Sequence, residues 1–149
     1  CNCDYIILLG TAVPFGSDPD ISGRNIWGYC KAGSPFPRII LGYINNRYRI
    51  SPLLMRKNQK TRDEVTALAR KISADESGKP DSLPPSELLQ TTLELLYAGQ
   101  IELGWYFFDA AWPANIPGKE ENKKEFCKWL AFSPYWKELE GYYAEHDIK

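Results

Sequence analysis

The hydrophobic pattern changes its period part-way along the chain. Residues 5–9 and 39–44 form short apolar runs with the length and the branched or aromatic side chains of β-strands. In "LGYINNRYRIS", two such runs are separated by Asn45 and Asn46, which tolerate the positive φ of a tight hairpin turn. We therefore predict a β-hairpin here. Its cross-strand packing is predicted to come from Tyr43, Tyr48 and Ile50.

From residue 61 onward the apolar spacing is helical. Thr61 and Glu64 form the T-x-x-E pattern of a capping box, and Gly78 stands where that helix would end. Ser86 is predicted to cap a second helix, which Gly99 ends. The apolar face of the first helix is Val65, Leu68, Ala69 and Ile72, and that of the second is Leu88, Leu89, Leu93 and Leu96.

The C-terminal stretch predicts further helices. A helix starting near Lys119 carries Phe126, Trp129 and Leu130 at helical spacing, and Ser133 followed by Pro134 is a strong start signal for another. These patterns together predict an α+β fold. A small N-terminal antiparallel β region, residues 1–57, would pack with a C-terminal helical bundle, residues 58–149, in a single domain.

Charge and composition narrow the function classes. The 149 residues have a net charge of −1, and no apolar run reaches the 18 residues that a membrane span needs. Residues 1–57 have a net charge of +4 and residues 58–149 a net charge of −5. Anionic headgroups would attract the basic half, although ordinary surface variation explains the asymmetry equally well. We predict no nucleic-acid partner, because no basic run has interleaved aromatic residues.

Cys1 stands at the start of the sequence, and the single methionine is Met55. An arbitrary boundary would give such a start, and so would cleavage of a signal peptide before a cysteine. The start resembles that of processed bacterial lipoproteins, whose first cysteine carries thioether-linked diacylglycerol and usually an N-acyl chain. The resemblance implies a covalent lipid on Cys1, with no other cofactor, and a location on the periplasmic face of the bacterial envelope. Asn2, where some enteric bacteria use Asp for retention, would leave the outer membrane open as a destination.

If Cys1 is acylated, three cysteines remain for pairing. We predict a Cys30–Cys127 disulfide, with Cys3–Cys30 as the alternative. No zinc site is predicted, because the chain lacks a second close cysteine pair and its single histidine, His146, lies in the tail. A calcium loop is also not predicted. Asp18, Asp20, Ser22 and Gly23 match its first positions, but Tyr29 stands where the closing Glu should be.

The segment "YAGQIELGWYFFDAAWP" has a recognisable spacing of small and aromatic residues. Its Gly99, Gly104, Phe108 and Ala111 resemble the second half of a tetratricopeptide repeat, which implies an antiparallel helical hairpin. The preceding helix departs from that family at Thr91, Thr92 and Leu95, Pro113 comes early, and no second copy follows. Packing alone explains the spacing, and a peptide-binding groove is the alternative. The ending "FFDAAWP…FCKWLAFSPYW" also resembles that of small bacterial lipoproteins.

Aromatic residues make up 13% of the chain and include five tryptophans. Trp105, Phe108, Trp112, Phe126 and Trp129 lie at helical intervals and are predicted to be mostly core. Aromatic residues on the short terminal segments should be less covered, and exposed aromatics are the usual anchors of protein interfaces. The candidate partner-binding residues are Trp105, Trp112, Tyr135, Trp136, Tyr142 and Tyr143.

The sequence carries no catalytic signature. His146 lies too near the end to suggest a Ser-His or Cys-His pair, and no phosphate-binding glycine loop is present. We predict a non-enzymatic, lipid-anchored envelope protein that binds another protein, as an accessory subunit of a membrane-associated assembly. One alternative is a periplasmic immunity protein that blocks a toxin. Another is a peptidoglycan hydrolase using Glu102 and Asp109.

Overall fold

A three-stranded antiparallel sheet forms the N-terminal part of the computed structural model, which describes residues 6–9, 37–74 and 84–146. Its strands are β1 (Ile6–Leu9), β2 (Arg38–Ile44) and β3 (Arg47–Ile50), with β2 in the middle. The predicted hairpin is confirmed. Asn45 and Asn46 have φ of 52° and 60°, as its turn requires, and Tyr43 pairs with Tyr48 across the strands. The pairing of β1 with β2 was not predicted.

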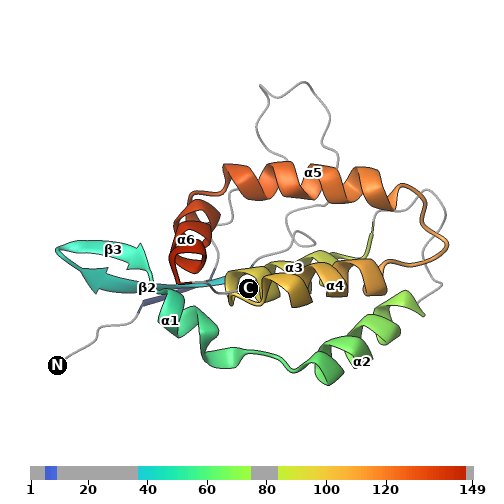
Figure 1. The fold of residues 1–149 in the computed structure, drawn as a ribbon, viewed down its shortest axis with the longest axis horizontal. Coiled ribbons are helices and arrows are strands. Elements are labelled where there is room, and N and C mark those ends of the chain that lie inside the picture. The colour runs from blue at the N-terminus through green and yellow to red at the C-terminus, as the bar shows by residue number, and fades with distance from the viewer. Residues whose placement is uncertain (1–5, 10–36, 75–83, 147–149) are drawn as a thin grey trace.

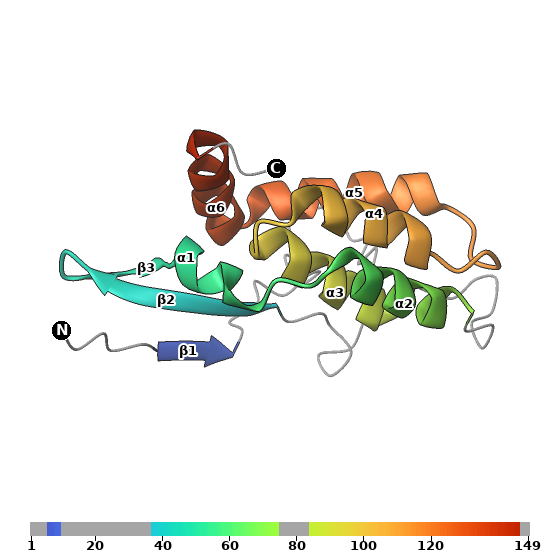
Figure 2. The ribbon, with the colours of Figure 1, turned by 60° about the horizontal axis from the view of Figure 1, so that its bottom comes forward.

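The turn end of the hairpin projects beyond the helices (Figures 1 and 2). Side chains alternate along β2 and β3, so one face carries Ile39, Leu41 and Ile50, all buried. Toward the turn, Tyr43 and Tyr48 continue this same face but are exposed, because no helix covers the end of the hairpin. The two strands of the hairpin therefore extend beyond the hydrophobic core to which their other ends contribute.

Two helical segments connect the sheet to the bundle. Helix α1 (Pro52–Met55) continues into a 3₁₀ turn, Arg56–Asn58, and then comes α2 (Arg62–Ser73). The predicted capping box is present, since the Thr61 side chain accepts from the Glu64 backbone and the Glu64 carboxylate accepts from the Thr61 backbone. The predicted apolar face of α2 is confirmed, with Val65, Ala69 and Ile72 buried and Leu68 partly buried.

Helices α3 (Ser86–Tyr97) and α4 (Ile101–Ala111) form an antiparallel hairpin at the centre of the bundle (Figure 1). Gly99, at φ 76°, ends α3 as predicted. Its N–H bonds to the Leu96 carbonyl while the Gln100 N–H bonds to the Leu95 carbonyl, which is a Schellman ending. The prediction that Ser86 caps α3 was wrong. Pro85 occupies the cap position, and its carbonyl accepts a hydrogen bond from the Leu88 N–H in a tight first turn.

Two further helices close the fold. Helix α5 (Lys119–Phe132) runs alongside α4 at the upper edge of the view, and α6 (Pro134–Glu145) turns sharply away from α5 (Figure 1). Ser133 caps α6 as predicted, because its hydroxyl accepts from the Trp136 N–H. On α5, Phe126 and Leu130 are buried and Trp129 is half-buried.

The predicted α+β fold is confirmed. A single cluster of buried residues includes Ile39, Leu41 and Ile50 from the sheet together with side chains from α2 to α6, so sheet and bundle share one core. Within the part of the chain that the structure describes, no helix is long and apolar enough to cross a membrane. Gly78 and residues 18–23 lie outside the described residues.

Candidate functional site

Three of the five exposed large hydrophobic side chains in the described residues lie together at the end of the hairpin. Tyr43, Ile44 and Tyr48 are 55%, 51% and 53% exposed. The tyrosine rings pack at 5.1 Å between centroids, and Ile44 lies on the opposite face of the hairpin with Arg47 and Arg49. We call Tyr43, Ile44, Arg47, Tyr48 and Arg49 the tip patch.

The tip patch belongs to a segment without acidic residues. Residues 37–62 contain no Asp or Glu. None of the ion pairs found in the described residues involves a cation of this segment. The first carboxylates after this segment are Asp63 and Glu64, at the start of α2 and away from the hairpin turn. The cations are Arg38, Arg47, Arg49, Arg56, Lys57, Lys60 and Arg62.

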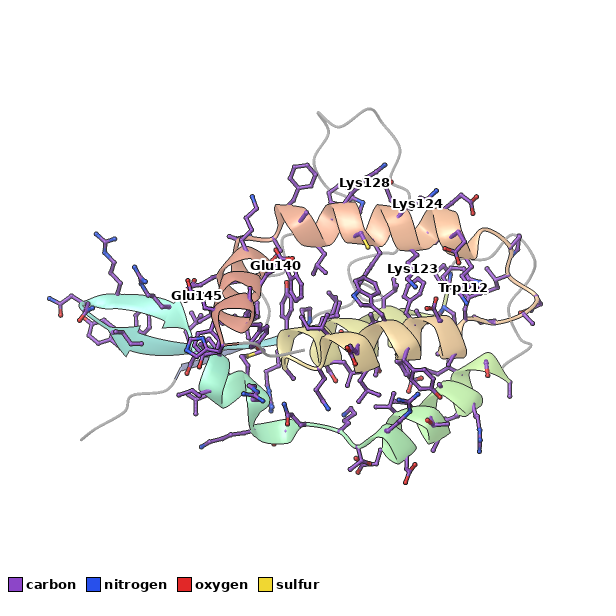
Figure 3. All side chains as sticks on the ribbon, viewed as in Figure 1. Trp112, Lys123, Lys124, Lys128, Glu140 and Glu145 are labelled. Atoms are coloured by element: carbon purple, nitrogen blue, oxygen red, sulfur yellow. The ribbon has the colours of Figure 1, made fainter. Side chains whose placement is uncertain are left out.

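A second exposed aromatic site lies where α5 turns into α6. Phe132 is the last residue of α5 and is 67% exposed, with its ring 6.4 Å from that of half-buried Trp129. Half-buried Tyr135 lies in the first turn of α6, just beyond the break at Ser133. We call Trp129, Phe132 and Tyr135 the corner patch. Figure 3 shows Lys124 and Lys128 on the outer side of α5, whereas Lys123 points toward α4.

Three of the predicted partner-binding residues are buried. Trp112 donates its indole N–H to the Ile116 carbonyl at 2.8 Å, and Tyr143 donates its hydroxyl to the Tyr97 carbonyl at 2.7 Å. Trp136 stacks on Tyr97 with 6.0 Å between ring centroids. The expectation that Trp136 and Tyr143 would be poorly covered was wrong, because α6 folds back onto the end of α3 and buries both.

The other predicted aromatic residues are half-buried. Trp105 belongs to an aromatic cluster between α4 and α5, with its ring 5.9 Å from that of Phe126. The Lys123 ammonium lies 5.6 Å from the centre of the Trp105 ring, within cation–π range. Tyr142 stacks on His146 at 4.0 Å near the end of α6. Of the predicted set, Trp105, Tyr135 and Tyr142 therefore keep an accessible edge.

The candidate catalytic carboxylates do not form a site with each other. Asp109 binds Lys123 at 2.7 Å and Lys119 at 3.4 Å on the surface of the bundle. Glu102 lies two turns earlier on α4, about 10 Å away along the helix axis, and lines a different hollow. The geometry thus lends no support to a hydrolase that uses this pair.

Two hollows lie on either side of a pair of hydrogen bonds between Lys60 and Gln100. The Gln100 side-chain amide donates to the Lys60 carbonyl at 2.7 Å, and its oxygen accepts from the Lys60 N–H at 2.9 Å. One, of about 300 Å³, includes Arg38, Lys60 and Glu94 in its wall. The other, of about 400 Å³, includes Arg56, Arg62 and Glu102. The wall of each hollow contains both cationic side chains and a carboxylate, so its charge does not indicate one class of ligand.

Cys127 is the one cysteine among the described residues, and it lies exposed on α5. Partial burial against the helix surface raises the pKa of the Cys127 thiol, and the nearby Lys123 opposes this. Cys1, Cys3 and Cys30 lie outside the described residues, so the Cys30–Cys127 disulfide stays a prediction. The described residues contain no cluster of His, Cys, Asp or Glu suited to a metal ion.

Comparisons with protein-family models, with curated proteins and with solved structures give no match to this chain. The lipoprotein and tetratricopeptide resemblances therefore stay predictions. Sequence reasoning missed the tip patch and Phe132 as exposed surface. The absence of acidic residues from residues 37–62 was the signal that could have drawn attention to the hairpin.

Proposed function

We propose that this protein is a non-enzymatic, lipid-anchored protein of the bacterial envelope that binds another protein, as an accessory subunit of a membrane-associated assembly. The corner patch is the observation that carries the protein-binding part of this proposal. It lies on the helical half, on the outer side of the fold, where a partner can reach it.

The energetics of the corner patch favour a partner. Phe132 is 67% exposed, whereas full burial of a phenylalanine side chain gains about 1.5–3 kcal/mol. Trp129 and Tyr135 each add an aromatic ring that is partly exposed. Aromatic side chains that become buried at the centre of an interface carry most of the binding energy.

Co-purification from native membranes tests this function. The full chain, solubilised with mild detergent, should retain a partner protein in stoichiometric amount. Phe132→Ser should reduce the retained partner at least tenfold. Leu53→Ser is the matched control, because Leu53 is 68% exposed but lies alone on α1. Equal retention by both variants, or no stoichiometric partner at all, would contradict the proposal.

The anchor has a separate test. The intact mass of the protein from the same membranes should exceed the mass of the chain by a diacylglycerol and an acyl group, located on Cys1. An unmodified Cys1 would overturn the envelope anchor, whatever the co-purification shows.

A further inference from the structure

We propose that the tip patch is a second membrane contact, which lies on the anionic headgroup surface of the bilayer that holds Cys1. This inference rests on the proposed lipidation of Cys1. It assigns a lipid surface to the hairpin and leaves the corner patch to the partner protein.

The strand register carries the first step. Strand β1 runs antiparallel to β2, with Ile6 opposite Leu41 and Leu9 opposite Arg38. The chain that precedes Ile6 therefore joins the sheet from the end where the hairpin turns. Cys1 is five residues before Ile6, and five fully extended residues span at most about 18 Å. Tyr43 is two residues beyond Leu41, about 7 Å further toward the turn. The chain is therefore long enough for an acyl group on Cys1 and the tip patch to reach the same bilayer.

The residue types at the tip carry the second step. Tyrosine is enriched at membrane–water interfaces, where its ring reaches apolar surface while its hydroxyl stays hydrated. Tyr43 and Tyr48 lie on one face of the tip, and Ile44 adds an apolar side chain on the other. Arg47 and Arg49 flank Ile44 and can donate to headgroup phosphates, which guanidinium groups bind in bidentate fashion.

The distribution of charge carries the third step. No carboxylate lies within residues 37–62, so nothing in this segment repels an anionic surface. Figure 3 places Glu140 and Glu145 on α6, beside the base of the hairpin rather than at its turn. Because attraction to anionic lipid falls off within a Debye length, the cations that project furthest contribute most.

Vesicle sedimentation tests the tip without the anchor. The probe is the full chain carrying Cys1→Ser, mixed with phosphatidylcholine vesicles containing one third phosphatidylglycerol or none. We expect binding to the anionic vesicles, with little binding to pure phosphatidylcholine and a strong loss as salt is added. Arg47→Gln with Arg49→Gln should weaken binding roughly tenfold or more, and Tyr48→Ser should weaken it several-fold.

Matched controls separate the tip from general charge and from misfolding. Lys124→Gln with Lys128→Gln removes the same charge from the outer side of α5 and should leave vesicle binding unchanged. Helical circular dichroism should be the same in all variants, because the side chains substituted on the hairpin and on α5 are exposed. Equal weakening by the α5 pair and the arginine pair would overturn the tip assignment, as would an absence of binding to anionic vesicles.

This failure is distinguishable from failure of the proposed function. An acylated Cys1 with a retained partner, combined with no effect of Arg47 and Arg49 on vesicles, overturns the tip contact alone. Loss of the co-purified protein in the arginine variant, with vesicle binding unchanged, would also overturn it and assign the tip to the partner protein.

Discussion

At Gly104 the backbone of α4 passes so close to α3 that the chain has no room for a methyl group. A Cβ there would lie 2.9 Å from Leu96 Cδ2 and 3.1 Å from its Cγ, and Leu96 is fully buried. Because Leu96 cannot swing away without displacing its neighbours, Gly104→Ala should destabilise the protein by about 1–3 kcal/mol through overpacking, less the helix propensity that Ala gains. Urea unfolding followed by helical circular dichroism measures the change.

Gly141 is the matched control for Gly104. It lies in the interior of α6 and is exposed, and a Cβ there meets nothing within 4 Å. Gly141→Ala should therefore stabilise the protein by about 0.5–1 kcal/mol, since only helix propensity and unfolded-chain entropy change. Two substitutions of the same sign would mean that helix propensity, rather than the close approach of α3 and α4, decides the effect at Gly104.

Local signals in single residues were read correctly from the sequence. Asn45 and Asn46 turn the hairpin, Gly99 ends α3 and Ser133 caps α6, because each of these roles depends on the residue and its immediate neighbours. Exposure was harder to predict. Phe132 ends the apolar stretch WLAF but is exposed, whereas Tyr143 lies in the more polar stretch EGYYAEH but is buried, because the packing of a whole helix decides which side chains are covered.

At the scale of an element, α6 is held to the bundle through the end of α3. Tyr143 donates to the Tyr97 carbonyl, Tyr97 and Ser133 share a hydrogen bond of 2.9 Å, and Trp136 stacks on Tyr97. Burial raises the pKa of Tyr143 to about 12, and Arg56 opposes the rise. The neutral phenol is therefore the form that fits the folded protein.

The Tyr143 pKa predicts a loss of stability in alkali. In the unfolded chain a tyrosine ionises near pH 10, whereas in the folded protein Tyr143 holds its proton until about pH 12. Above pH 10 the folded state thus binds more protons than the unfolded state, so stability falls as pH rises from 10 to 12, by up to about 1.4 kcal/mol per unit. Below pH 10 this contribution is fully present.

Tyr143→Phe isolates this contribution from the other tyrosines. At pH 8 the variant should be less stable by about 1 kcal/mol, because the bond to the Tyr97 carbonyl is lost while the ring is kept. The difference in unfolding free energy between the two proteins should shrink above pH 10 and change sign before pH 12. If the difference in unfolding free energy stays constant over this pH range, Tyr143 has the same pKa in the folded and unfolded states, which would contradict the prediction.

Sequence periodicity predicted which strands and helices exist better than it predicted which of them lie next to one another. The hairpin and the helices after residue 61 repeat apolar residues at intervals that a local reading detects. By contrast, β1 pairs with β2 across almost thirty intervening residues, and no local pattern specifies which strand a short apolar run will join. The tip patch was missed for a related reason, because the sequence does not tell where the helical body ends beneath a hairpin.

At the scale of the whole molecule, sheet and bundle share one core, and this predicts that they unfold together. Ile50 in β3 is buried, and it lies opposite Leu41 in the same core cluster as the helices. Ile50→Ala should therefore lower the stability of the helices as well as the sheet, by about 2–4 kcal/mol. Ile44→Ala, on the same hairpin but 51% exposed, should change it by less than about 0.5 kcal/mol.

Two probes decide whether this cooperativity holds. Circular dichroism at 222 nm follows the helices, and backbone amide exchange in β2 and β3 follows the sheet. In Ile50→Ala, both should give the same lowered midpoint in urea. Helices that keep their original midpoint while the sheet exchanges freely would mean that the hairpin folds independently of the bundle. A hairpin held rigidly by the shared core would instead keep the tip patch at a fixed place relative to the helices. Such a fixed arrangement is required if the tip patch contacts the bilayer while the corner patch contacts the partner protein.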